Sequence, residues 1–221
     1  MDGPRLLVDN EGLHGMVKKC GTITLSSGAH SIYLEGFQAG GGVGMKMEYS
    51  GPDTKNQVVY MPSGRVSGPY FPLCDPTSKS PANAAQFTIC MFQSKMAGNL
   101  QSIPLIGDAV ATNQLSYVGQ GSLPVVDMHT LQAFRQYVPG TPDGNYVWAI
   151  YGKLVISSAG SYNLCISSDD GLVMELCFKS VLHSYFFLYA VQSYMWTVHL
   201  NRHWWMMMDF MEWSRDVEQR T

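Results

Sequence analysis

The chain has 221 residues, a formal net charge of −3 and only 14% charged residues. This charge balance argues against a nucleic-acid-binding protein, which presents a basic face to its ligand. The length suffices for one domain with a full core, or for one domain and a linker. The 22 glycines and 12 tyrosines, with Val, Ile and Thr spread through short runs, favour an all-β protein with many turns.

Alternating apolar residues predict an antiparallel β segment in residues 1–53. Residues 20–25, 30–37 and 45–49 each alternate with period two, as half-buried strands do. A short apolar run at 6–8 precedes them, and a glycine-rich turn separates the last two strands. We therefore expect three or four strands here.

The middle of the chain begins with an aperiodic stretch, 54–84, whose Pro, Ser, Gly and Asn content predicts a linker. Strands are then predicted at 87–92, 146–156 and 162–167, with a short helix or turn around 131–134. Before residue 176, the sequence shows no helix-period pattern of useful length. Residues 85–176 are thus interpreted as a second β segment.

Residues 177–221 differ in kind from the rest. Segment 181–200 has the length of a transmembrane helix but carries two His, two Ser, a Thr and a Gln. We therefore expect an atypical, irregular tail, foreign to the domain, that does not contact a membrane.

The five cysteines are odd in number and widely spaced, and no Cys-x-x-Cys pair indicates a zinc site. One or two disulfides form if the protein is secreted, and buried free thiols are the alternative. The spacing does not give the pairing. The cysteines are Cys20, Cys74, Cys90, Cys165 and Cys177.

Residues 167–171 read Ser-Ser-Asp-Asp-Gly and close a predicted strand. Adjacent carboxylates repel each other, so such a pair indicates a turn that binds a cation, caps backbone N–H groups, or does both. Asp9 and Asn10 either belong to the same face of the domain or form an ordinary Asx turn.

Several motifs together resemble the PA-fourteen domain family. Residues 159–171 match the family's Gly-x-Tyr strand and Ser-Asp-Asp-Gly turn, residues 6–15 match what should follow that turn, and residues 21–53 match the family's second half. The resemblance implies an antiparallel β-sandwich or barrel. The halves occur here in reversed order, as in one period cut from a tandem array.

The reversed order leads to a structural prediction. Each half alone would leave sheet edges and an apolar face uncovered. We expect the halves, 1–53 and 85–176, to close on each other as a circularly permuted domain, with strands from 20–49 paired to strands from 146–167. A chain that begins inside a module also explains the absence of a signal peptide at its start.

The resemblance also implies a candidate site at Asp169 and Asp170. In sugar-binding adhesins of the family, the adjacent aspartates sit across a cis peptide and bind Ca²⁺, with an asparagine from a later loop. Here that loop reads Gln38-Ala39-Gly40-Gly41-Gly42 and has no asparagine, so the calcium site is incomplete. Backbone carbonyls of 39–42 remain candidate donors. The expected ligand-binding residues are Asp169, Asp170, Gln38, Gly40 and Gly41.

The family implies carbohydrate binding or adhesion at a cell surface or outside the cell, with glycans as partners and Ca²⁺ as a candidate cofactor. The alternatives are a structural spacer module without a ligand, and an accessory domain of a glycosidase. We expect no catalysis, because no nucleophile elbow or phosphate-binding loop appears. Two adjacent aspartates also fit poorly the glycosidase requirement for carboxylates facing each other across a cleft.

Overall fold

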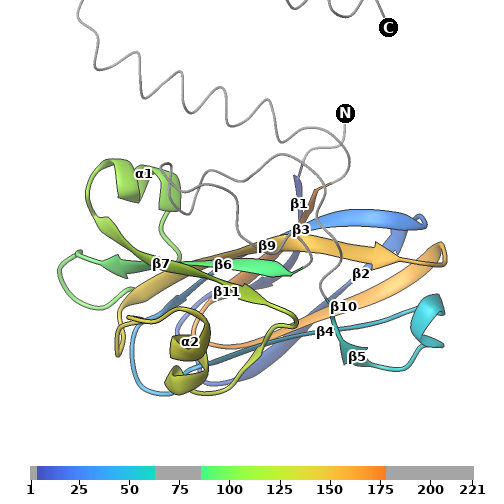
Figure 1. The fold of residues 1–221 in the computed structure, drawn as a ribbon, viewed down its shortest axis with the longest axis horizontal. Helices are drawn as coiled ribbons and strands as arrows, with labels where there is room; N and C mark the ends of the chain where they lie inside the picture. The colour runs from blue at the N-terminus through green and yellow to red at the C-terminus, as the bar shows by residue number, and fades with distance from the viewer. Residues whose placement is uncertain (1–3, 63–85, 178–221) are drawn as a thin grey trace, which may run out of the picture. The chain divides into compact units, whose positions relative to one another are not determined.

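A computed structural model describes residues 4–62 and 86–177, which form two layers of antiparallel β-sheet (Figure 1). The six-stranded sheet contains, in spatial order, β1 (Pro4–Asn10), β11 (Leu172–Cys177), β3 (Gly28–Gln38), β9 (Tyr146–Ile156), β6 (Phe87–Ser94) and β7 (Leu115–Leu123). The five-stranded sheet contains β2 (Val17–Leu25), β10 (Gly160–Asp169), β4 (Gly44–Ser50) and β5 (Val59–Tyr60), and β8 (Asp127–Met128) also pairs with β4. The expected all-β sandwich is confirmed.

Strands of the two described segments are interleaved in both sheets. We call residues 4–62 the N segment and residues 86–177 the C segment. Strand β10 of the C segment lies between β2 and β4, while β11 lies between β1 and β3, and β3 also pairs with β9. The predicted pairing of strands from 20–49 with strands from 146–167 is therefore confirmed, and both segments share one sandwich.

The main core lies between the two sheets, where the alternating side chains of each strand meet. On β3, Ile32 and Leu34 are fully buried, while Tyr33 and Glu35, which alternate with them, are not. At one end of this core Phe134 packs edge-to-face on Tyr146 and Trp148, with ring centroids 6.1 and 5.7 Å away. Such pairs prefer this geometry because the edge of one ring is attracted to the face of the other.

The six-stranded sheet is also covered over part of its other face. Residues 95–115 cross that face and bury a second cluster. They include the short helix α1 (Ile106–Ala111). This double burial explains why most of β6 is apolar instead of alternating between apolar and polar residues. The second cluster consists of Phe37, Cys90, Phe92, Leu100, Ile106, Ala109, Leu115, Val147, Ala149 and Tyr151.

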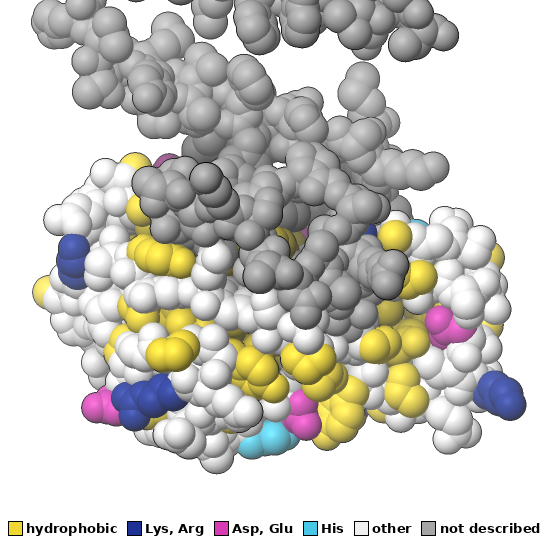
Figure 2. Space-filling model, viewed as in Figure 1, with side chains coloured by type: hydrophobic (Ala, Val, Ile, Leu, Met, Phe, Trp, Pro, Cys, Tyr) yellow, Lys and Arg dark blue, Asp and Glu magenta, His cyan; other side chains and the backbone are white. Residues whose placement is uncertain are grey.

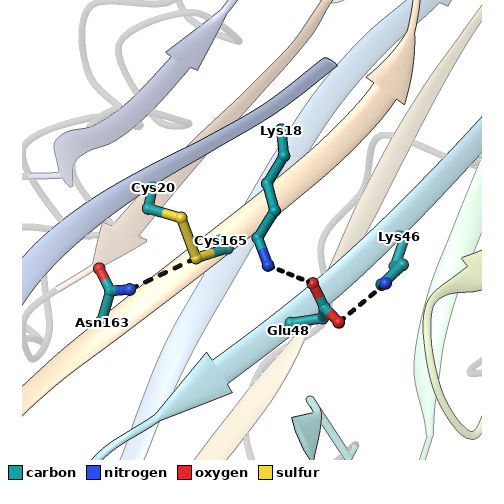
Figure 3. A network of polar contacts seen from close by, with 6 residues as sticks. All are labelled: Lys18, Cys20, Lys46, Glu48, Asn163 and Cys165. Carbon is teal, nitrogen blue, oxygen red and sulfur yellow. Dashed lines mark hydrogen bonds and ion pairs between the residues drawn. A yellow bond between two sulfur atoms is a disulfide. The ribbon is translucent and has the colours of Figure 1, made fainter. Parts of the chain in front are cut away.

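The outer face of the five-stranded sheet is polar (Figure 3). Glu48 on β4 accepts from Lys18 on β2 at 2.7 Å and from Lys46 at 2.8 Å. On the same face a disulfide joins Cys20 of β2 to Cys165 of β10, at directly paired positions. The cysteine pairing that the sequence left open thus includes a covalent link between the N and C segments.

The predicted linker 54–84 is wrong at its start. A 3₁₀ turn (Pro52–Thr54) leads into β5, which pairs with β4, and Met61 is fully buried. The buried Met61 and the pairing of β5 were missed because this stretch shows no periodicity. Residues 63–85 lie outside the described part of the chain, as does the predicted tail beyond Cys177.

Two short helices interrupt the strands. The second, α2 (Leu131–Tyr137), forms where a helix or turn was expected, and Thr130 caps it by accepting from Ala133 N. Helix α1 was not predicted, and neither was β7, whose glycines and polar residues mask its alternation. None of the helices in the described residues is long and apolar enough to cross a membrane.

Candidate functional site

Three loops meet at one end of the sandwich, where the aspartate pair lies. The β10–β11 turn, residues 170–171, contacts the β1–β2 loop through the hydrogen bond from Asp170 N to His14 O, 2.8 Å. It contacts the β3–β4 loop through Ala39 N, which donates to Asp170 Oδ2 at 2.9 Å. We call this region the loop end; it brings together residues that lie more than 100 positions apart in the chain.

Asp170 is a structural residue of the loop end. Its side chain is buried, and its backbone adopts the left-handed conformation, φ 58°, which Asp tolerates better than most residues. Because its carboxylate caps one loop and its N–H bonds another, Asp170 holds both loops in place. This matches the capping alternative for the predicted aspartate pair.

Asp169 is placed differently. It is partly exposed on the outer side of β10, opposite Gly44, and its carboxylate has no hydrogen-bond or ion-pair partner in the described part of the chain. Burial, and secondarily the neighbouring Asp170, raise the pKa of the Asp169 carboxyl, while His14 acts to lower it. Asp169 is thus the member of the pair that is available to a ligand.

Gly42 and Gly44 shape the surface around Asp169. A Cβ on Gly42 would lie 2.5 Å from Asp169 Oδ2, and a Cβ on Gly44 would lie 2.3 Å from Met16 Cε. Both contacts are too close for a larger residue. The absence of these side chains leaves the carboxylate beside the exposed loop Gly40–Gly42, while the apolar Met16 lies over Gly44, the residue paired with Asp169.

Gln38 does not face a ligand. It is only 1% exposed, and its Nε2 donates to the carbonyl oxygens of Gly40 at 3.1 Å and Gly42 at 2.6 Å. This side chain therefore fixes the glycine loop from inside. Of the residues expected at the site, the structure brings Asp169, Asp170, Gly40 and Gly41 to the loop end as exposed or turn-forming groups and places Gln38 beneath them.

Asp9 and Asn10 have different structural roles. Asp9 Oδ1 accepts from Glu11 N at 3.0 Å, the Asx turn that was one of the two interpretations. Asn10 is fully buried and donates from Nδ2 to Ser168 Oγ at 2.9 Å and to Val17 O at 3.1 Å. Asn10 therefore ties β1 to β10 just below Asp169.

Several polar atoms beneath the loop end are buried without a hydrogen-bond partner. Tyr146 Oη and Trp148 Nε1 lack one in the described structure, as do Gln38 Oε1 and Asn10 Oδ1. Burial raises the pKa of the Tyr146 hydroxyl, so this group stays neutral. Sequence reasoning did not find Tyr146 and Trp148, because in a predicted strand they read only as apolar core residues.

The donor set fits Ca²⁺ poorly. This ion takes six to eight oxygen ligands, but one oxygen of Asp170 already accepts from Ala39 N, and the carbonyls of Gly40 and Gly42 accept from Gln38. The described residues contain no group of three or more His, Cys, Asp or Glu side chains suited to a metal. The cis peptide of the adhesins is likewise absent, since all described peptide bonds are trans.

Comparison with known proteins does not assign the chain to a family. The chain matches no protein-family model, no curated protein and no solved structure.

Proposed function

We propose that this domain is a non-enzymatic binding module that takes carbohydrate at the loop end, with Asp169 as the main polar contact. The observation that carries this proposal is the contrast between the two aspartates. Asp170 is buried and bonded to the β3–β4 loop, whereas Asp169 keeps a carboxylate with no described partner at the surface. A partly buried charge without a partner is costly for folding and is therefore a candidate for function.

The surroundings of Asp169 suit a sugar. A carboxylate accepts hydrogen bonds from neighbouring hydroxyl groups, and apolar side chains pack against the C–H face of a pyranose. Leu13 and Met16 expose about half of their surface on the adjoining loop, and Gly40–Gly42 leave room for a ligand to approach the backbone. This combination of a few polar groups with apolar surface is typical of small-ligand sites.

The disulfide supports an extracellular or cell-surface location. Cys20–Cys165 joins paired strands, and such bonds persist in oxidising compartments. The proposal of a non-enzymatic role rests on Asp170, because a glycosidase needs two carboxylates facing its substrate. Here one carboxylate of the pair is committed to Ala39 N.

A glycan array tests the proposal. The wild type should retain a set of glycans that Asp169→Asn loses, because the neutral amide cannot act as a charged acceptor. Asp108→Asn is the matched control, since Asp108 is an exposed carboxylate on α1. Thermal melts of all three proteins check that they fold equally well.

The array also separates the rival functions. If the wild type retains no glycan, the spacer module without a ligand is favoured and the proposal is wrong. If Asp108→Asn loses the same glycans as Asp169→Asn, the loop end is not the site. Repeating the array with a chelator, alongside calorimetric Ca²⁺ titration, decides whether binding depends on calcium despite the incomplete donor set.

A further inference from the structure

The pairing of the N and C segments leaves each one dependent on the other. Within the described residues, no two of the strands β1–β4 are hydrogen-bonded to each other. Each of them pairs instead with β9, β10 or β11. The C segment is more self-sufficient, since β6, β7 and β9 pair among themselves, but β10 and β11 have only N-segment partners.

The core follows the same division. Leu34 of the N segment packs within one cluster with Ile150 and Met174 of the C segment, and these residues occupy paired positions on β3, β9 and β11. The Cys20–Cys165 bond adds a covalent link between the segments across a sequence separation of 145. An N segment without a C segment would expose unpaired strand edges and an apolar face.

We propose that two copies of this chain exchange strands, with the N segment of each copy completing the sheets of the C segment of the other. A second copy is the partner because only another N segment carries β1–β4 in the registers that pair with β9–β11. It also places Cys20 where Cys165 requires it. Exchange of identical elements is a low-cost route to a dimer, since both forms make the same contacts.

The balance between the closed and exchanged forms is set by concentration. Residues 63–85 join the two segments within one chain, and linked partners usually meet at an effective concentration on the order of 1 mM. A second copy competes when its concentration approaches that value, or when folding starts from unpaired segments. The dimer should therefore form on concentrated refolding.

The experiment uses the unmodified chain in two isotopic forms. Light and heavy protein are unfolded with reductant, mixed in equal amounts, refolded at high concentration in an oxidising buffer, and separated into monomer and dimer by size. Peptides joined through Cys20 and Cys165 are then identified by mass spectrometry, with fragment spectra that separate Cys165 from Cys177. Exchange predicts that about half of these joined peptides in the dimer pair one light with one heavy partner.

Two controls fix the interpretation. Light and heavy samples refolded separately and mixed afterwards give the background from disulfide scrambling. Cys165→Ser identifies the peptide pair, which must disappear in this variant. A mixed share in the dimer well above that background supports the proposal. A dimer whose joined peptides are all light–light or heavy–heavy overturns it, and so does the absence of any dimer at about 1 mM.

Discussion

The two sheets of the sandwich differ in how many of their faces are buried. In the six-stranded sheet, β6 and β9 are buried on both faces along most of their length. In the five-stranded sheet, the second half of β2 alternates between buried and exposed residues, and its first half is exposed. The first sheet therefore supplies most of the hydrophobic stabilisation, while the second offers a polar surface to solvent.

The largest effect should come from the outer face of the six-stranded sheet. Phe92 is 1% exposed there and packs edge-to-face on Tyr117. We expect Phe92→Ala to lower the free energy of unfolding by about 3–5 kcal/mol. Tyr60→Ala is the matched change on the five-stranded sheet, where Tyr60 is 46% exposed, and it should cost less than about 1 kcal/mol. Urea denaturation measures both, and equal losses would contradict the contrast between the sheets.

The disulfide is an exception on the polar face. Cys165→Ser removes the bond to Cys20 and frees the N segment from its covalent link to β10. We expect a loss of about 2–4 kcal/mol, because the unfolded chain regains the entropy of a long loop. Urea denaturation under oxidising conditions checks this value. Ser161→Ala, on the same face of β10, serves as a control and should change stability by less than about 0.5 kcal/mol.

The two aspartates at the loop end should also differ in how much they contribute to stability. Asp170→Ala removes the acceptor of Ala39 N and places Ala at φ 58°, so we expect a loss of about 1–3 kcal/mol. Asp170→Asn, which keeps an oxygen and tolerates this backbone, should lose less. Asp169→Ala should stay within about 0.5 kcal/mol of the wild type. A larger loss from Asp169→Ala than from Asp170→Ala would reverse the assigned roles.

A substitution at Glu48 tests how much the ion pairs on the polar face contribute to stability. Partial burial acts to raise its pKa, but Lys18 and Lys46 outweigh burial and hold the pKa below the ordinary 4.5. The stability gained from this carboxylate is present above pH 4.5 and is lost as the pH falls through its lower folded value. We expect Glu48→Gln to cost less than about 1 kcal/mol near neutral pH and nothing in strong acid. Urea midpoints as a function of pH report this difference.

The smallest effect on stability is expected at Asp169, and it should have the opposite sign. The pKa of Asp169 is raised above its ordinary 3.8, so its ionised form is disfavoured in the folded protein. Stability is therefore lost as the pH rises through the folded pKa. Asp169→Asn should be slightly more stable than the wild type at neutral pH, and the gap should close below pH 3.8. Thermal melts at both pH values test the sign, and a less stable variant at neutral pH would contradict it.

Most of the strands could be predicted because apolar and polar residues alternate along their sequences or because the run is almost wholly apolar. Ile32 and Leu34 alternate with more exposed residues, and the run at Phe87–Phe92 is apolar except for Thr88. Strand β7 was missed because Gly119 and Gly121 replace side chains where Val138 and the backbone of Tyr137 come close. Its place in the sheet depends on that packing, which leaves no periodic signal in the sequence.

The candidate site could be predicted only in part. The sequence indicated that Asp169 and Asp170 share a turn, and the structure gives the two carboxylates different partners. That division depends on the approach of Ala39, 131 positions away, which no local pattern encodes. Gln38 was expected to contact a ligand because it lies beside the glycine loop. Its burial follows from its inward-facing position on β3, opposite Tyr146.

The register of β1 with β11 determines how the domain would respond to tension. Pro4 pairs with Cys177, and the strands run antiparallel from there to the pair of Asn10 and Leu172. A pull applied through residues 4 and 177 would therefore peel these strands apart one hydrogen bond at a time, rather than shearing all of them together. Peeling would stop at the stretch that Cys20–Cys165 clamps on the other sheet. Under such a load the domain would yield early where β1 pairs with β11 and would extend by a limited length.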